Sequence, residues 1–549
     1  MVSGAFFLYN ERVGEKPLKG GAAVPKERIG IMGGSFNPIH DRHMEIAACA
    51  KREHKLDRVI FLPAGNPPHK HEGLADAEYR FEMTRLAVSG MQGFSVSRME
   101  IDREGVTYTV DTLTRLQKQM PGAELYYLIG EDTLFDLPNW RRPDKVFTLC
   151  RFLVCSRETG ELAQNPQVRE LEERGAKFSF LSLPPDAESA TAIREALARG
   201  ETPGGVRPQV LEYIRIMGLY GCRESPQGAA ACYPRLRQLL TDKRLLHSLL
   251  VASTARDLAR RHGVSEDQAA MAGLMHDCAK CLPLAQQQRI ARESRLLLDR
   301  ETLQSENLLH GPVGAVVAER EFGVRDPNVL SAIRCHTTGK VGMLPLDMIV
   351  YLADKIEPSR RSYPALEKVR ELAQSDLVAA MRYSLESTLA YVRTQKTTPH
   401  PTTQRVADWL ERLASNRQEP ADQRIKGAKR MNEMIQKIVT TLYDKKAQDI
   451  VALDVSGMTV ITDCMVIASG RSALQVKTLA DEVEDRLSEG GVYPLRKEGQ
   501  QEGRWVVLDY GTVLVHIFHT EEREFYRLDK LWEADNNRIA LPFEESEEG

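Results

Sequence analysis

The pattern of apolar and polar positions divides the chain into regions with different periodicities. Residues 28–220 alternate short apolar runs with helical patterns. Such alternation predicts βαβ units built around a parallel sheet. The runs expected to form strands are Ile29–Met32, Val59–Leu62, Leu125–Ile129 and Phe152–Cys155.

The two later regions follow other patterns. Residues 235–415 repeat apolar side chains at helical spacing and contain no strand pattern, which predicts an all-α domain. Residues 431–549 mix the two periods and predict a small α+β domain with a mixed sheet. In this last region a helix is expected over Ser472–Ser488, and strands over Trp505–Asp509 and Val513–Phe518.

Polar, aperiodic stretches separate these regions. Residues 221–234 and 416–430 read as linkers, and residues 1–27 as an extension, or as translation from a start codon placed too early. A chain of 549 residues is expected to hold about three domains of ~100–200 residues each. The expected order is therefore an α/β domain, an all-α domain and an α+β domain.

Charge and composition narrow the function classes. The net charge is −3, but residues 431–549 carry 13 Lys+Arg against 23 Asp+Glu, a balance of −10. The last domain is therefore not expected to bind DNA or RNA through phosphates. No apolar run reaches the ~18 residues of a membrane helix, and the nine unpatterned cysteines suit reduced thiols in a cytoplasm. The one CxxC, Cys278 and Cys281, is expected to be incidental and helical.

The first chemical motif is GGSFNPIHDRH (33–43), directly after the strand Ile29–Met32. Its glycines, Gly33 and Gly34, let the backbone turn tightly and approach a phosphate, and the following helix would direct its N-terminal amides at that anion. His40 and His43 lie three residues apart and can stabilise charge on a phosphorus. For such a pair alone, two polar loop histidines are an equally good interpretation.

Four further stretches resemble bacterial nicotinate mononucleotide adenylyltransferases, within the nucleotidyltransferase superfamily. They are PAGNPPHK (63–70), GVTYTVDTL (105–113), LIGEDTLFDLPNW (128–140) and ESATAIR (188–194). The resemblance implies a Rossmann-like fold and transfer of adenylate from Mg²⁺-bound ATP to nicotinate mononucleotide, without a covalent intermediate.

The same resemblance assigns roles to individual residues. His40, His43, Lys70 and Arg194 would face phosphates, Trp140 would stack on the nicotinate ring, and Tyr108 and Thr109 would lie beside its carboxylate. For Trp140 a core position is the alternative. The remaining substrate-binding positions implied by the motifs are Ser35, Phe36, Asn37, Gly130, Asp132, Ser189 and Thr191, together with Gly33 and Gly34.

One position departs from the family signature, which has a glycine immediately before its second histidine. Arg42 occupies that position here. A long cationic side chain would crowd the adenosine site, whereas both histidines are retained. We therefore expect adenylyl transfer to persist with altered ATP affinity.

The helical region contains a second constellation. Four histidines and two aspartates, on successive predicted helices, suit two ions of iron, manganese or zinc. One histidine on an apolar helix face is usually a core residue. Four histidines together with two aspartates in one small domain favour a metal site. These candidate ligands are His247, His276, Asp277, His310, His336 and Asp354.

The order H…HD…H…H…D resembles the HD-domain phosphohydrolases. The flanking LLHGPVGA, CHTTG and ADKIEPSR resemble the HD family that cleaves diadenosine tetraphosphate symmetrically to ADP. This resemblance implies a di-iron centre, with Asp277 also catalytic and with Lys280, four residues after His276 on the expected helix, and Arg360 contacting phosphates. Both cations could equally be solvated surface charges, and a dNTP remains an alternative substrate. The GYP element of cyclic-di-GMP phosphodiesterases is absent, which disfavours cyclic-di-GMP as the substrate.

The pattern of residues 431–549 indicates no combination of nucleophile, base and orienting residue, although Cys464, His516 and His519 are present. KKAQDIVALDV (445–455), ITDCMVIASGRSALQVKTLADEV (461–483), EGRWVVLDYGTVLVHIF (502–518) and EREFYRLDKLWEAD (522–535) resemble the ribosomal silencing factor family. That resemblance implies binding of ribosomal protein L14 on the large subunit to block subunit joining. Candidate contact residues, each of which could instead be core, are Trp505, Tyr510, Phe525, Tyr526 and Trp532.

The sequence thus predicts a multifunctional cytoplasmic protein with no membrane association. The competing interpretation is a scaffold in which one fused enzymatic site is inactive, and Arg42 makes the first site the stronger candidate for that loss.

Overall fold

The computed structural model describes residues 26–66, 73–156, 162–182, 189–394, 398–418, 421–455, 462–533 and 537–543. Two compact units make up the chain. One runs through Thr337 and includes Ile349–Arg370, and the other holds Thr338–Met348 and the chain from Glu371 onwards. No helix among the described residues is long and apolar enough to cross a membrane.

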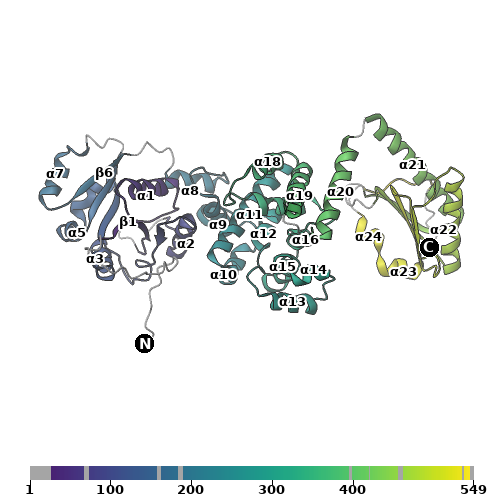
Figure 1. The fold of residues 1–549 in the computed structure, drawn as a ribbon, viewed down its shortest axis with the longest axis horizontal. Helices are drawn as coiled ribbons and strands as arrows, with labels where there is room; N and C mark the ends of the chain where they lie inside the picture. Colours follow the sequence, from purple (N-terminus) through teal and green to yellow (C-terminus); the bar gives the residue numbers. More distant parts are fainter. Residues whose placement is uncertain are drawn as a thin grey trace. The chain divides into compact units, whose positions relative to one another are not determined.

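A six-stranded parallel sheet organises the first region (Figure 1), as the alternating pattern predicts. The strand order is β3-β2-β1-β4-β5-β6, so the order reverses between β1 and β4. The strands are β1 (Arg28–Gly34), β2 (Arg58–Pro63), β3 (Phe94–Val96), β4 (Glu124–Gly130), β5 (Arg151–Ser156) and β6 (Phe178–Ser182). In such sheets ligands bind beyond the carboxyl ends of the strands at the reversal point.

Helices flank this sheet and bury its apolar side chains. Apolar residues of β1 and β4 share one core with those of α3 and α5, while α1 contacts β1, β2 and β4. The helices of this region are α1 (Asp41–Glu53), α2 (Ala77–Val88), α3 (Thr109–Gln119), α4 (Glu131–Asp136), η1 (Leu137–Asn139), α5 (Pro143–Leu149), α7 (Pro166–Glu173), α8 (Ala190–Ala198), α9 (Pro208–Ile216) and η2 (Leu219–Gly221).

The regular secondary structure of the next region is helical in all of its described residues, with no strand, as predicted. Helices α11 and α12 approach closely because Gly273 has no side chain: a Cβ there would lie 2.8 Å from the Cα of Ala252. The helices are α10 (Ala229–Leu239), α11 (Asp242–His262), α12 (Glu266–Met275), α13 (Leu284–Glu293), α14 (Arg300–Gln304), α15 (Glu306–Phe322), α16 (Pro327–Cys335), α17 (Pro345–Ile356), α18 (Pro364–Ala373), α19 (Leu377–Thr394) and α20 (Pro401–Gln418).

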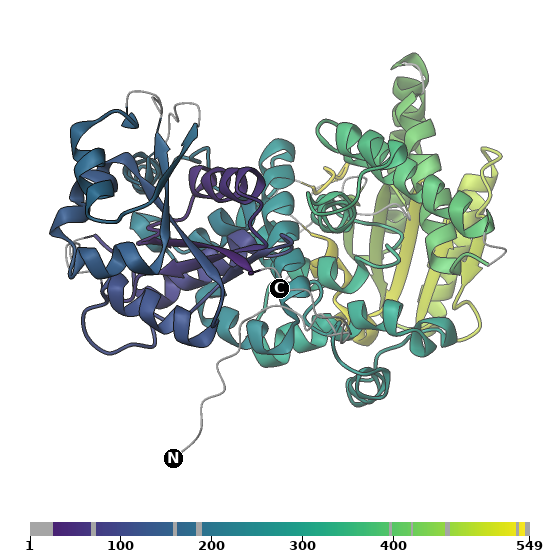
Figure 2. The same ribbon diagram turned by 60° about the vertical axis from the view of Figure 1, so that its left-hand side comes forward.

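The C-terminal region is built on a five-stranded mixed sheet of order β7-β8-β11-β10-β9, in which β8 and β11 are parallel and the other neighbours antiparallel. Helices α21 and α22 pack on one face (Figures 1 and 2). A smaller apolar cluster around Phe518 lies on the other face. The elements are α21 (Ala421–Asp444), β7 (Gln448–Asp454), β8 (Cys464–Gly470), α22 (Ala473–Ser488), β9 (Arg496–Glu498), β10 (Trp505–Asp509), β11 (Val513–His519), α23 (Thr520–Tyr526) and α24 (Leu528–Trp532).

Both of the stretches that were predicted to be linkers contain helical residues. Helix α10 begins at Ala229, and its Cys232 and Tyr233 are buried, so apolar burial outweighs the small and turn-forming composition of 221–234. The backbone of 416–430 includes the end of α20 and the start of α21. The extension 1–27 lies outside the described residues except for Lys26 and Glu27.

Candidate functional sites

A pocket of about 480 Å³ opens at the carboxyl ends of β1 and β4. It brings together several of the residues singled out in the sequence, although their motifs are up to about a hundred positions apart. Those that line it are Gly33, Gly34, Ser35, His43, Thr109, Gly130 and Trp140. Gly33 is required by packing, because a Cβ there would lie 2.3 Å from the phenol oxygen of Tyr127.

The histidine pair caps helix α1. His40 is the N-cap residue, and the side chains of His40 and His43 bond reciprocally to each other's backbone amides, with 3.2 Å between His40 N and His43 Nδ1. Burial, and then the neighbouring His40, lower the pKa of His43 to about 3. This ring is therefore neutral at physiological pH and would act toward a phosphate as a hydrogen-bond donor rather than as a cation.

Arg194 lies beside the same loop, because its guanidinium donates to the backbone oxygen of Asn37 at 2.8 Å. The side chain of Asn37 is itself held by Gly73, Ala75 and Tyr220. Asn37, like the Phe36 ring, is thus buried structure rather than pocket lining. Ser189 caps helix α8, and Thr191 accepts a hydrogen bond from Arg194. Lys70 lies outside the described residues.

Trp140, Tyr108 and Asp132 differ in their position relative to this pocket. Trp140 both lines the pocket and packs edge-on against Tyr127, so its stacking and core interpretations are compatible. The Tyr108 ring lies 4.5 Å beneath the Arg141 guanidinium, outside the pocket lining. Asp132 is exposed on the first turn of α4.

A pocket residue that the motifs did not reveal is Glu100. It is 9% exposed, and its carboxylate accepts a hydrogen bond from Thr112 at 2.8 Å. Burial raises the pKa of this carboxyl above its usual range. Only the fold brings Glu100 into the pocket, because an isolated glutamate carries no periodic or motif signal.

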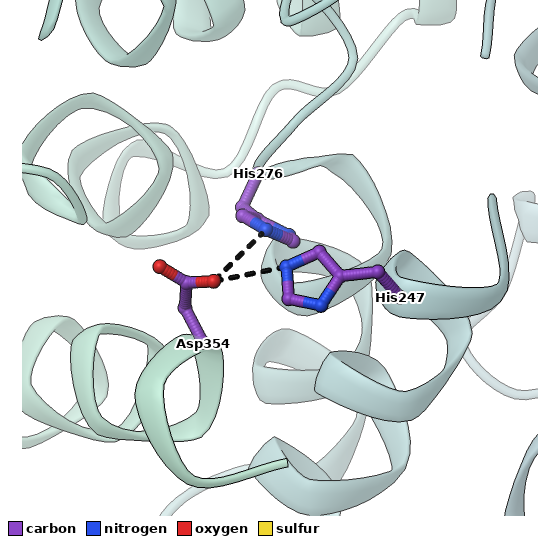
Figure 3. Close-up of side chains that lie close together, drawn as sticks. All are labelled: His247, His276 and Asp354. Carbon is purple, nitrogen blue, oxygen red and sulfur yellow. Dashed lines mark hydrogen bonds and ion pairs between the residues drawn. The ribbon is translucent and has the colours of Figure 1, made fainter. Parts of the chain in front are cut away.

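The candidate metal ligands of the helical region converge in a buried cluster. His247 projects from α11, His310 from α15 and Asp354 from α17, while His276 and His336 directly follow α12 and α16. Figure 3 shows His247 and His276 turned toward the Asp354 carboxylate, which lies 2.9 and 3.8 Å from their Nε2 atoms. Asp277 lies 3.1 Å from Nε2 of His310 and 3.3 Å from Nε2 of His276.

In all four histidine rings, Nδ1 faces an oxygen atom. Nδ1 of His276 faces Gly273 O and Nδ1 of His336 faces Ile333 O, each at 2.7 Å; Nδ1 of His310 faces Glu306 O at 3.3 Å. Nδ1 of His247 faces the Glu357 carboxylate at 3.1 Å. Acceptors on Nδ1 hold the proton there and leave the Nε2 lone pair for a metal.

This arrangement fits a bound cation. Nε2 of His310 and Nε2 of His336 are 3.0 Å apart, so two lone pairs face each other. The buried Nε2 of His276 lies 3.3 Å from Asp277 but forms no hydrogen bond of acceptable geometry among the described residues. A positive ion between imidazoles and carboxylates would remove both conflicts. Burial, followed by the neighbouring His276 and His310, lowers the pKa of His336 to about 3 and keeps that ring neutral, as a ligand must be.

Cationic side chains surround the two carboxylates. Arg360 lies 2.7 Å from Asp354, and Lys280 lies 3.4 Å from Nδ1 of His310. Contrary to the sequence expectation, Lys280 and both cysteines of the CxxC lie in turns after α12, which ends at Met275. Arg244, absent from the sequence prediction, lies 2.6 Å from Asp277; its position one helical turn before His247 is the signal that was missed.

In the C-terminal domain the aromatic candidates separate by exposure. Phe525 and Tyr526 are 78% and 51% exposed, whereas Tyr510 is buried. Trp505 stacks on Phe518 and donates its indole N–H to Nδ1 of His516 at 3.2 Å. Trp532 packs against the cluster around Phe518, so only part of the predicted set is available for contact.

Comparisons with known proteins match the three regions separately. Family models match residues 31–196 (Cytidylyltransferase-like), 244–359 (HD domain) and 428–549 (Ribosomal silencing factor during starvation). A Mycoplasma genitalium protein with the name "Probable nicotinate-nucleotide adenylyltransferase/Ap4A hydrolase" is 30% identical over 366 residues, which cover 66% of this chain and 97% of that protein.

Two further relatives each cover one region. A "Probable nicotinate-nucleotide adenylyltransferase" of Lachnoclostridium phytofermentans is 40% identical over 197 residues, 35% of this chain and 98% of its own length. The crystal structure of a predicted HD superfamily hydrolase involved in NAD metabolism, from Clostridium acetobutylicum, aligns at 34% identity with a TM-score of 0.33, covering 34% of this chain and 97% of that one.

Proposed function

Because the chain belongs to the nicotinate-nucleotide adenylyltransferase/Ap4A hydrolase family over its first two regions and continues into a ribosomal silencing factor domain, we propose that it joins two nucleotide-processing enzymes to a ribosome-binding module in the cytoplasm. The observation that supports the hydrolase part most strongly is the convergence of four Nε2 atoms and two carboxylates in one cluster. We propose the domain limits 28–220, 235–415 and 431–549, with the intervening stretches helical in part.

The first domain transfers adenylate from ATP to nicotinate mononucleotide. The pocket at the ends of β1 and β4 admits the nucleotides, with the backbone at Gly33 and Gly34 and the start of α1 beside the phosphates. His40, His43, Arg194 and Lys70 position the triphosphate and stabilise the charge that develops as pyrophosphate leaves. Trp140 stacks on the nicotinate ring, with Thr109 and Tyr108 at its carboxylate, and Mg²⁺ accompanies ATP.

The second domain hydrolyses diadenosine tetraphosphate to two ADP molecules. Its six ligands hold two metal ions, which we propose are iron and which supply a hydroxide nucleophile and charge neutralisation when bound. Arg244 and Arg360 pair with the two aspartates of the cluster and Lys280 lies beside His310, so these cations would turn to the substrate phosphates once the carboxylates are neutralised. A dNTP is the second candidate substrate for this site.

The third domain binds the large ribosomal subunit at ribosomal protein L14 and blocks subunit joining. The acidic balance of the domain suits a basic protein partner. Phe525 and Tyr526 supply an exposed aromatic contact. Co-sedimentation of the full chain with purified 50S subunits at low salt tests this proposal, and absence of the protein from the pellet would contradict it.

The hydrolase proposal is tested by separating the two activities in one preparation. His276→Ala and Asp277→Ala should abolish ADP release from diadenosine tetraphosphate and leave nicotinate adenine dinucleotide synthesis unchanged, because the two sites use different residues. Asp257→Ala, at an exposed position on α11, is the matched control. Unchanged hydrolysis in either ligand variant would refute the assignment.

The same assay distinguishes the scaffold interpretation. A preparation that hydrolyses the tetraphosphate but makes no dinucleotide would show that the first site is inactive. Recovery of synthesis in Arg42→Gly would then identify Arg42 as the cause.

A further inference from the structure

A second cavity lies in the C-terminal domain, among strand β7, helices α23 and α24 and the segment around Arg538. Its volume is about 570 Å³, and four basic side chains line it: Arg523, Arg527, Lys530 and Arg538. The domain from Met431 onwards has 13 basic and 23 acidic residues. Nearly a third of its basic residues therefore surround one cavity in a domain whose overall charge is negative.

Arg523 is the buried member of this group. Its side chain is only 7% exposed, and Nη2 donates to the backbone oxygen of Asp449 at 3.1 Å and to the Asp529 carboxylate at 3.4 Å. Nη1 is buried and has no hydrogen-bond partner among the described residues. A buried guanidinium N–H without an acceptor is costly, so a further acceptor at this atom would be favourable.

The strand beside Arg523 is shaped to hold it. The pairing of β7 with β8 is irregular between Gln448 and Val451, and Asp449 has a left-handed φ of 49°. Such an irregularity takes a backbone oxygen out of the ladder and re-aims it, here toward Arg523. The guanidinium is thus oriented from the sheet side, and Arg523 lines the cavity together with Asp449 and Val451 of β7.

Two of the four cations of the cavity are already in ion pairs, Arg523 with Asp529 and Arg538 with Glu533. Two further acidic residues, Asp449 and Glu524, also line the cavity. Arg527 and Lys530 are exposed at the rim. A fork of guanidinium donors beside a lysine matches the oxygen atoms of a phosphate group, which accept several charge-assisted hydrogen bonds at once.

We propose that this cavity binds a single phosphate group, supplied either by a free nucleotide or by an RNA chain. Phe525 and Tyr526 are exposed on α23, between Arg523 and Arg527 in sequence, and offer a surface on which a base can stack. The cavity goes beyond the proposed protein contact of this domain and does not depend on it, because its lining residues do not include Phe525 and Tyr526, the two rings that both proposals use.

Hydrogen exchange measured by mass spectrometry on the full chain tests the proposal locally, since the enzymatic domains also bind phosphates. Peptides covering β7, α23 and α24 are followed at low salt with orthophosphate, ADP or a short oligouridylate. We expect slower exchange in these peptides with at least one ligand. The double variant Arg527→Gln, Lys530→Gln should require about tenfold more ligand for the same protection, corresponding to ~1.4 kcal/mol.

Arg486→Gln, an exposed arginine on α22 remote in sequence from the cavity residues, is the matched control and should behave as the parent chain. Protection by orthophosphate or ADP identifies a free phosphate as sufficient, and protection by oligouridylate alone identifies an RNA backbone as the source. Absence of protection with all three ligands, or equal protection in the double variant and the parent, overturns the proposal. Because the double variant leaves the buried Arg523 in place, loss of folding does not confuse the result.

Discussion

Among the candidate metal ligands, the ring of His247 is held in its orientation by the carboxylate of Glu357. Glu357 is 1% exposed and accepts from Nδ1 of His247, and it is itself held by the amide and the hydroxyl of Ser359, each at 2.6 Å. A carboxylate behind a ligating imidazole sets its tautomer and raises its basicity. Glu357 is therefore a positioning residue, and it acts on the metal only through His247.

Replacing Glu357 with Gln should weaken metal binding about 10- to 100-fold, because the amide orients the ring but does not strengthen it as a base. The dissociation constant for Mn²⁺ or Fe²⁺, measured by calorimetry, checks this, with adenylyl transfer as the test of folding. Glu367→Gln, an exposed carboxylate on α18, is the control. Equal metal affinity in Glu357→Gln and the parent would contradict the assigned role.

Arg42 presents a different residue-scale question. Its side chain is 18% exposed and lies 3.5 Å from Glu45, so it is held along α1 by a weak pair. We expect Arg42→Gly to lower the KM for ATP severalfold and leave the KM for nicotinate mononucleotide unchanged, since both histidines remain. Steady-state kinetics with each substrate varied decide this, and an altered KM for the mononucleotide alone would contradict it.

Among the elements, strand β11 buries a histidine that has a lowered pKa. Burial, with a smaller contribution from Arg523, lowers the pKa of His516 from 6.5 to about 4. Its Nδ1 accepts from Trp505, an arrangement that requires the neutral ring. Since the unfolded chain takes up a proton near pH 6.5 and the folded domain only near pH 4, stability is complete above pH 6.5 and falls as the pH drops through this window.

The C-terminal domain should accordingly lose about 2 kcal/mol of unfolding free energy between pH 7 and pH 5 through this one residue. His516→Gln should remove that part of the loss. Pulse proteolysis in urea at the two pH values measures the domain within the full chain, and His262→Gln on α11 serves as the control. An identical pH dependence in His516→Gln and the parent would show that the ring does not carry the effect.

For the molecule as a whole, buried ion pairs link the first two regions of the chain into one unit. Glu212 of α9 is 0% exposed and accepts two hydrogen bonds from Arg256 of α11, at 3.1 and 2.8 Å. Arg85 of α2 bonds Asp242 of α11 at 2.7 Å. These contacts join the domain with the nucleotide pocket to the domain with the candidate metal ligands. In the sequence, the two domains lie on either side of residues 221–234, which were predicted to form a linker.

Removing one partner should destabilise both domains together. Arg256→Ala removes both hydrogen bonds of the buried Glu212 carboxylate to that guanidinium and leaves it only the 3.9 Å pair with Arg215. Breaking a buried pair in this way typically costs about 3–5 kcal/mol. We expect calorimetry to show the unfolding of both enzymatic regions at a lower temperature, whereas Arg260→Ala, which breaks an exposed pair on the same helix, should have little effect. A shift confined to one activity's thermal inactivation would mean that the two regions unfold independently.

The sequence by itself determined the three fold classes, the strands β1, β2, β4 and β5, helix α22 and strands β10 and β11, because periodicity reports which face of an element is buried. It also singled out candidate residues for metal and phosphate binding, because those chemistries are local to residue types. The candidate metal ligands could be named because each lies in its own short motif, and their role stays a prediction.

The tertiary structure alone decided which side chains meet. Glu100, Arg244 and Glu357 joined the sites only when separate elements packed together. The end of the stretch 221–234 became part of helix α10, in which Cys232 and Tyr233 are buried. The phosphate cavity in an acidic domain was likewise invisible to a count of charges. Burial and proximity depend on contacts between distant parts of the chain, and no pattern along the sequence encodes those distances directly.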